Sequence, residues 1–181
     1  NSLKVSTLEG LKNNYEKINT IIFSGDVFRH SSLKKWKWLE EFLGDRIISY
    51  IAPGNHDVGI NNDSKSRKFF NNSIFGINPY PQHFSKENIN ILIEDSIRSK
   101  WQISSKTKKT LSKYNQSSKT ILIRHNIPIK ELLIYANSRA GIKGNLPALK
   151  NLSKEIKDEL TIIAGDTGAF SNKPRVGCWK Q

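Results

Sequence analysis

The sequence predicts a layered α/β fold, in which short buried strands alternate with amphipathic helices. Apolar, β-branched segments of strand length recur along the chain, and longer segments with apolar residues at helical spacing lie between them. Each of the clearest apolar segments also ends at a Gly, a Pro or a polar residue, as expected where a buried strand leaves its sheet. These segments are residues 20–25, 46–53, 119–124 and 161–165.

The first half of the chain alternates helix and strand. The segment SSLKKWKWLEEFLG places Leu33, Trp36 and Leu39 on one helical face, and Gly44 is a suitable residue to end that helix. The elements predicted here are a helix at 6–18, a strand at 20–25, a helix at 31–44, a strand at 46–53 and a polar helix or loop at 61–75.

The second half continues the alternation after a turn region. Pro79 and Pro81 mark this turn, and Pro147 stands near the first turn of a later helix, where proline is tolerated. The elements predicted here are a turn at 76–83, a strand at 88–95, a helix at 105–115, a strand at 119–124, a helix at 146–160 and a strand at 161–165.

Length and composition indicate one domain. The 181 residues include 36% hydrophobic residues, which is enough for a core, and we expect a single domain over residues 1–181. The chain lacks methionine and starts at Asn1, so we expect a piece of a longer protein that is incomplete at both ends. No apolar run is long enough to span a membrane. Cys178 has no partner for an internal disulfide, and we predict a cytoplasmic protein.

The charge balance permits a polyanionic partner. The formal net charge is +13 and the isoelectric point is about 9.8, values that are typical of proteins that bind nucleic acid or anionic surfaces. The lysines are scattered, however, and solvated helices explain them more simply. Nucleic acid is therefore an alternative partner that rests on the charge alone.

Polar residues follow the predicted strands. Asp26 follows the first strand, Asn55 and His56 follow the second, His125 follows the third and Asp166 follows the last. If these strands are neighbours in one sheet, their carboxyl ends meet at one edge, which is where ligands bind in α/β folds. A single polar residue after a strand is usually part of a turn, but a succession of them is harder to explain in that way.

The motifs GD at 25–26, GNHD at 54–57, His125 and GDTG at 165–168 resemble, in this order, those of the calcineurin-like metallophosphoesterases. That family reads D-x-H, G-D-x-x-D, G-N-H-D/E, H and G-H-x-H. The segment NILIEDSIRSKWQISSKTKKTL, residues 90–111, also resembles a stretch of the family in which a strand and a Gln-Leu-Ser sequence precede a helix. The resemblance implies an α/β/β/α sandwich, here incomplete at the ends.

The resemblance also implies a metal centre. It makes Asp26 a bridge between two divalent ions, and it makes Asn55, His125 and Asp166 ligands of the second ion. Manganese, iron, zinc and magnesium all accept such oxygen and imidazole ligands. The implied reaction is hydrolysis of a phosphomonoester or phosphodiester by a metal-activated hydroxide. The class of phosphorylated substrate does not follow from the sequence.

Catalytic and substrate-binding residues follow from the same resemblance. His56 corresponds to the general acid near the leaving group, and Asp57 is expected to orient it. Arg29 stands where G-D-x-x-D has its last Asp, and we expect Arg29 and His30 to contact the substrate phosphate. A salt-bridged surface residue is an equal alternative for Arg29.

Departures from the family pattern favour an alternative function. The D-x-H motif is absent and is expected on a strand before residue 1. In GDTG, Asp166 stands where G-H-x-H has its first His, and Gly168 stands where it has its last His. A chain with these changes has lost ligands of the first metal ion. The alternative is therefore a catalytically degenerate phosphoesterase fold that acts as a binding module.

Overall fold

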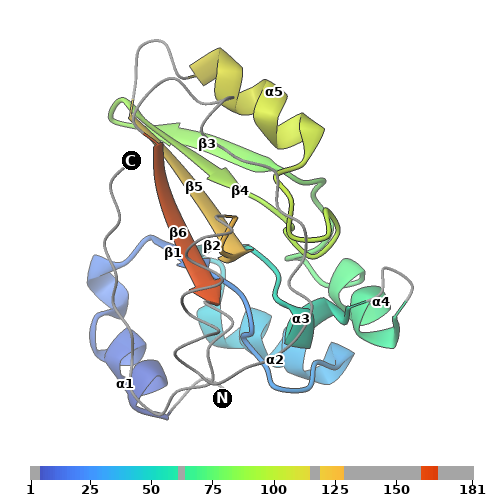
Figure 1. Cartoon of the computed structure of the whole chain (residues 1–181). Coiled ribbons are helices and arrows are strands. Elements are labelled where there is room, and N and C mark those ends of the chain that lie inside the picture. The colour runs from blue at the N-terminus through green and yellow to red at the C-terminus, as the bar shows by residue number, and fades with distance from the viewer. Residues whose placement is uncertain (1–4, 61–63, 115–118, 129–159, 167–181) are drawn as a thin grey trace, which may run out of the picture.

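The computed structural model describes residues 5–60, 64–114, 119–128 and 160–166, which form a mixed α/β structure (Figure 1). In chain order the elements are α1 (Val5–Asn13), the 3-10 helix η1 (Tyr15–Lys17), β1 (Thr20–Phe23), α2 (Leu33–Leu43), β2 (Ile48–Ile51), α3 (Asn55–Val58), α4 (Lys65–Asn71), β3 (Gln82–Lys86), β4 (Ile89–Ile93), α5 (Ser105–Tyr114), β5 (Lys119–Asn126) and β6 (Leu160–Asp166). The helix predicted at 146–160 lies outside the described residues, except for Leu160, which belongs to β6.

The strands form two sheets. Strands β1 and β2 pair in parallel, and β3, β4, β5 and β6 form a second sheet in that order. In the second sheet β4, β5 and β6 are parallel, whereas β3 is antiparallel to β4. The strands that precede the polar residues are therefore divided between two sheets, which differs from the single sheet that we considered.

Strand β3 is an element that the sequence did not predict. Its sequence, QHFSK, is mostly polar, and among the described strands it pairs with β4 alone. The two strands are joined by Glu87 and Asn88, whose φ angles are 50° and 66°. Positive φ at both turn residues is the geometry of a tight hairpin turn, which here holds β3 against the apolar strand β4.

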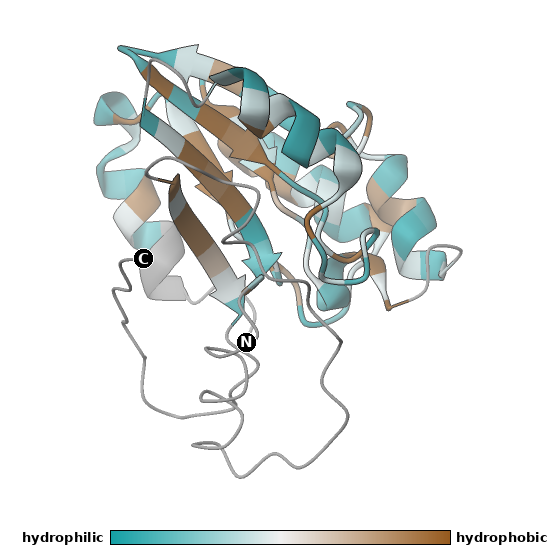
Figure 2. Cartoon of the chain, turned by 45° about the horizontal axis from the view of Figure 1, so that its top comes forward, coloured by the Kyte–Doolittle hydropathy of each residue, from teal (hydrophilic) through white to brown (hydrophobic). Residues whose placement is uncertain are grey.

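Both faces of the larger sheet are covered. Leu92 and Leu122 pack with Leu111 of α5, whereas Ile93 and Ile123 pack towards β1 and β2. Alternate residues of a strand point to opposite faces, so these pairs show which face meets the helix and which meets the smaller sheet. Figure 2 shows the resulting contrast between the apolar strands and the mainly hydrophilic helix α5.

A third cluster lies between the smaller sheet and the helices α2 and α4. Its centre is Trp36, which is fully buried and lies 4.9 Å from Phe28, 5.3 Å from Phe70 and 5.7 Å from Phe75 between ring centroids. Ser32 begins α2 by accepting a hydrogen bond from the Lys35 amide. This packing fixes the helices on the outer side of β1 and β2.

No helix in the described ranges is both long and apolar enough to cross a membrane.

A buried ion pair joins β5 to the end of β4. Glu94 and Arg124 are 1% and 0% exposed, and their Oε2 and Nη1 atoms lie 2.9 Å apart. Glu94 also accepts a hydrogen bond from the Ser104 amide, and Arg124 donates one to the Trp101 carbonyl. Burial lowers the pKa of Arg124, and the Glu94 carboxylate opposes this change. The pair therefore fixes the loop before α5 against the sheet.

We predict that Arg124→Met lowers the free energy of unfolding by about 3–5 kcal/mol, because it leaves the Glu94 carboxylate buried without its partner. The matched control is Lys119→Met on the same strand, where the side chain is exposed and a change within about 0.5 kcal/mol is expected. Urea denaturation of both variants measures the difference. Equal stabilities would show that the pair contributes nothing.

Candidate functional site

The carboxyl ends of the two sheets meet at a few close contacts. The Ala52 amide donates to the Phe23 carbonyl at 2.8 Å, which keeps the ends of β1 and β2 together. His125 of β5 contacts the Ser24 carbonyl through Nδ1 at 3.0 Å. Gly165 of β6 lies so close to Ser24 that a Cβ added to it would stand 2.0 Å from the Ser24 carbonyl oxygen. Polar residues from β1, β5 and β6 are therefore brought to one place.

His125 is the centre of this arrangement. Its side chain is 1% exposed, and because the Ser24 carbonyl can only accept, the Nδ1 atom must carry the proton. The other ring nitrogen, Nε2, is buried and has no hydrogen-bond partner. It lies 3.4 Å from Asp26 Oδ1 and 3.6 Å from Asp166 Oδ2. An imidazole held by a backbone carbonyl in this way is the usual form of a metal-ligating histidine.

These distances fit donors around one ion. Two ligands that each hold a metal at about 2.0–2.2 Å with a tetrahedral angle lie roughly 3.3–3.6 Å apart. In the part of the chain that the structure describes, no group of three or more His, Cys, Asp or Glu side chains is arranged as a metal centre. The donor types and the unpartnered Nε2 atom thus fit a divalent ion, although the side chains do not form an assembled centre.

Asp26 adopts a backbone conformation that is uncommon for a residue with a side chain. Its φ angle is 54°, and that of Gly25 before it is 97°. The Asp26 carboxylate accepts a hydrogen bond from the His56 amide at 3.0 Å. Asn55 is the residue between His56 and Gly54, and an added Cβ on Gly54 would lie 2.2 Å from Asp26 Oδ1. The start of α3 is therefore packed directly onto this carboxylate.

His56 is exposed, and its ring is held by a backbone group. Its Nδ1 atom lies 2.9 Å from the Arg29 carbonyl, so Nδ1 donates and Nε2 remains available. The side chains of Arg29 and His30 are both exposed. The Arg29 main chain thus has a definite place in the site, while the contact of its side chain with a phosphate remains a prediction.

The contacts of Asp57 differ from those expected of a residue that orients the ring of His56. It is fully buried, and its carboxylate accepts hydrogen bonds from the amides of Gly54 at 3.0 Å and Phe28 at 3.3 Å. Burial raises the pKa of Asp57 to about 6, and these two amides oppose the rise. Asp57 therefore holds the loop after β1 against α3, and it can position His56 only through the backbone.

Three glycines have a steric role in the site that the sequence analysis did not predict. Gly25, Gly54 and Gly165 each stand where a side chain would collide with a residue of the site. A signal for them was present in the sequence, because a glycine precedes Asp26, Asn55 and Asp166 in turn. Gly168, the position of the last altered family residue, lies outside the described residues.

Comparison with known proteins identifies a family. A family model described as calcineurin-like phosphoesterase matches residues 5–140. This range contains Asp26, Asn55 and His125, whereas Asp166 lies beyond it. No curated protein matches the chain.

We predict that Gly25→Ala destabilises the protein by at least about 1–3 kcal/mol, the cost of a strained backbone conformation. The added Cβ would also stand 2.4 Å from His125 Nδ1 and 2.7 Å from the Ala52 carbonyl. Gly10→Ala is the matched control, because Gly10 lies in α1 with nothing within 4 Å of its added Cβ. There a gain of about 0.5–1 kcal/mol is expected. Thermal denaturation compares the two, and an unchanged Gly25→Ala protein would contradict the close approach.

Proposed function

Because the chain belongs to the calcineurin-like phosphoesterase family, we propose that it is a metal-dependent hydrolase of a phosphomonoester or phosphodiester. The observation that carries this proposal is the buried, unpartnered Nε2 atom of His125, which faces the carboxylates of Asp26 and Asp166. We further propose one domain over residues 1–181, arranged as an α/β/β/α sandwich. The apolar clusters on both sides of each sheet support that arrangement.

We assign the metal ligands as Asp26, Asn55, His125 and Asp166. These side chains account for one divalent ion, and Asp26 is the residue expected to be shared with a second. When bound, such an ion polarises a phosphoryl oxygen and lowers the pKa of a coordinated water. The identity of the ion, whether manganese, iron, zinc or magnesium, is not part of the proposal.

The exposed side chains next to Asp26 are assigned to the substrate. His56 keeps its Nδ1 atom on the Arg29 carbonyl, so Nε2 is the atom that holds a proton for the leaving group. Arg29 and His30 are exposed on the same loop and are assigned to the phosphate oxygens. Asp57 fixes the loop and the start of α3 relative to each other, and so acts as a positioning residue for His56.

A binding module is the second candidate. The observation that favours it is in the sequence, where Asp166 and Gly168 stand in place of the two histidines of the family motif G-H-x-H. A protein of this kind binds a phosphate-bearing partner without hydrolysing it. Nucleic acid is a further candidate partner, and only the net charge of +13 supports it.

We predict that the purified protein binds a divalent ion and that His125→Ala weakens this binding at least roughly tenfold, since it removes the buried imidazole donor. His83→Ala is the control, because His83 is an exposed histidine on β3 that stacks on Tyr114. Manganese titration by calorimetry, together with elemental analysis, measures both. Absence of metal from the parent protein, or equal binding by both variants, would refute the assignment of His125.

We predict that His56→Ala lowers kcat about 10²–10⁴-fold, the usual contribution of a general acid. The loss is expected to be larger for phenyl phosphate than for 4-nitrophenyl phosphate, because the poorer leaving group depends more on a proton. Metal content is expected to stay unchanged, and His83→Ala again serves as the control.

The same assay separates the two candidate functions. Equal losses with both esters would remove the general-acid role of His56. A parent protein that binds metal but hydrolyses neither ester nor a phosphodiester such as bis(4-nitrophenyl) phosphate would favour the binding module.

A further inference from the structure

A pocket of about 430 Å³ lies between α4, the turn before β3 and the loop after β4. We propose that this pocket binds a small organic anion, in which a carboxylate or phosphate group is carried on an apolar or aromatic body. The residues that carry the argument are Arg67, Asn71, Asn78, Tyr80, Asp95 and Arg98. The proposal does not depend on the hydrolytic function.

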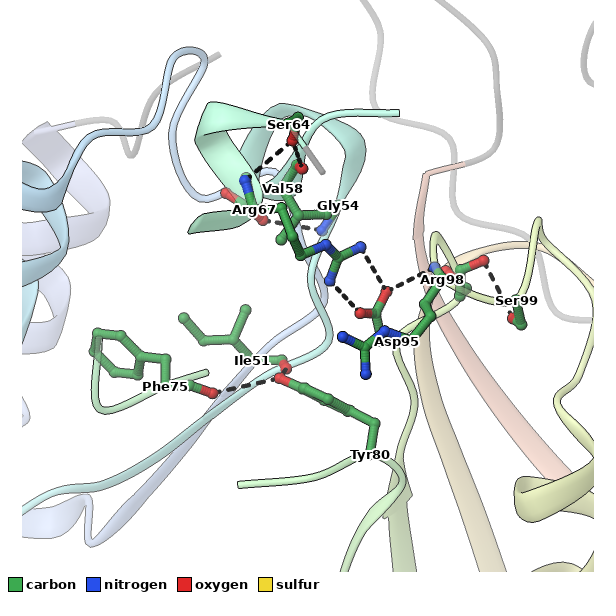
Figure 3. A network of polar contacts seen from close by, with 12 residues as sticks. Ile51, Gly54, Val58, Ser64, Arg67, Phe75, Tyr80, Asp95, Arg98 and Ser99 are labelled. Atoms are coloured by element: carbon green, nitrogen blue, oxygen red, sulfur yellow. Dashed lines mark hydrogen bonds and ion pairs between the residues drawn. The ribbon is translucent and has the colours of Figure 1, made fainter. Parts of the chain in front are cut away.

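A buried ion pair forms one wall of the pocket. Arg67 and Asp95 are 2% and 4% exposed, and the Arg67 guanidinium contacts both oxygens of the Asp95 carboxylate. The Arg67 amide is held by the Ser64 side chain, and Asp95 also accepts a hydrogen bond from the Arg98 amide at 3.0 Å. Figure 3 shows this network. The wall is therefore fixed before any ligand binds, and the Asp95 charge is already compensated.

Arg98 supplies the charge that selects an anion. Its side chain is exposed and reaches from the loop after β4 towards Asp95 and Tyr80 (Figure 3). Arg67 and Asp95 cancel each other, so Arg98 leaves the lining with a formal charge of +1. The exposed amides of Asn71 and Asn78 add hydrogen-bond donors. A guanidinium beside such donors is suited to a carboxylate or a phosphate group.

The remaining wall is suited to an apolar body. Ile77 and Pro79 are exposed in the lining, and Tyr80 lies beside them. The Tyr80 hydroxyl is occupied, since it donates to the Ile51 carbonyl at 2.6 Å, and burial raises the pKa of Tyr80. Tyr80 thus stays neutral and offers its ring. The volume lies within the range for small-molecule pockets and exceeds that of a bare inorganic anion.

The pocket is next to the candidate active site but separate from it. Ile93 pairs with Ile123, so Asp95 stands level with His125 on the neighbouring parallel strand. Glu94 and Arg124 point together to the α5 side, which leaves Asp95 and His125 on the other face of the sheet. None of the proposed metal or catalytic residues lines the pocket. Binding to one site can therefore be measured apart from the other.

The test is calorimetric titration of the protein with benzoate and with phenyl phosphate, in the presence of EDTA so that no ester is hydrolysed. We expect both anions to bind and neutral benzyl alcohol to bind more weakly. Arg98→Ala is expected to weaken the binding of both anions at least roughly tenfold, because it removes one charge-assisted hydrogen-bonding group. Lys68→Ala is the matched control, because it removes an exposed positive charge of α4 that does not line the pocket.

A second control locates the bound anion. Arg29→Ala alters the candidate active site, where phenyl phosphate also has a proposed place, so this control is read with benzoate, whose binding is expected to stay unchanged. If Arg29→Ala weakens binding and Arg98→Ala does not, the anion lies in the active site and the pocket proposal is wrong. The same conclusion follows if Arg98→Ala and Lys68→Ala have equal effects, or if neither anion binds the folded parent up to about 10 mM. Circular dichroism confirms that each variant is folded.

Discussion

The site depends on one packing constraint, which is the close approach of the end of β1 to strands β5 and β6. Ser24 is the contact point: its carbonyl meets His125 Nδ1 at 3.0 Å and lies where a side chain on residue 165 would have to go. The approach is sterically permitted only because residues 25 and 165 are glycines. Asp26 reaches His125 because the chain turns sharply at this contact, with φ angles of 97° and 54° at consecutive residues. The geometry across the two sheets thus follows from backbone contacts that no side chain separates.

The sequence predicted those features whose cause is local. The apolar runs became β1, β2, β4, β5 and β6, and the polar residues at their ends were found at the sheet edges, because strand burial and chain exit are read from neighbouring residues. The sequence could not indicate which side chains pair with each other when 28 to 30 positions separate them. The ion pairs of Arg67 with Asp95 and of Arg124 with Glu94 are of this kind, and nothing local distinguishes these arginines from surface ones. Strand β3 was missed for a related reason, since its polar sequence becomes a strand through pairing with β4.

The two buried arginines serve the structure and do not account for the net charge. Arg67 and Arg124 are 2% and 0% exposed and are matched with carboxylates inside the protein, so neither is offered to a polyanion. Glu94 and Asp95 are consecutive, yet their side chains point to opposite faces and each meets its own arginine. This arrangement ties the end of β4 both to β5 and to α4. Each buried arginine is cancelled by a carboxylate, so the two pairs leave the net charge of +13 unchanged, and that excess lies on the other basic residues.

The carboxylate at position 166 has a consequence for the charge of the proposed site. Nδ1 of His125 is held as a donor by the Ser24 carbonyl, and Nε2 faces the oxygens of Asp26 and Asp166. Carboxylates that face one another repel unless a positive charge lies between them, and solvent screens this repulsion in part because Asp26 and Asp166 are each 31% exposed. A family site with imidazole at position 166 would present one negative charge fewer. With Asn55 as the fourth proposed ligand, the set has three oxygen donors and one nitrogen donor, which manganese, iron, zinc and magnesium all accept. In the proposed site, the aspartate at position 166 therefore supplies an oxygen donor and a negative charge where the family motif has an imidazole.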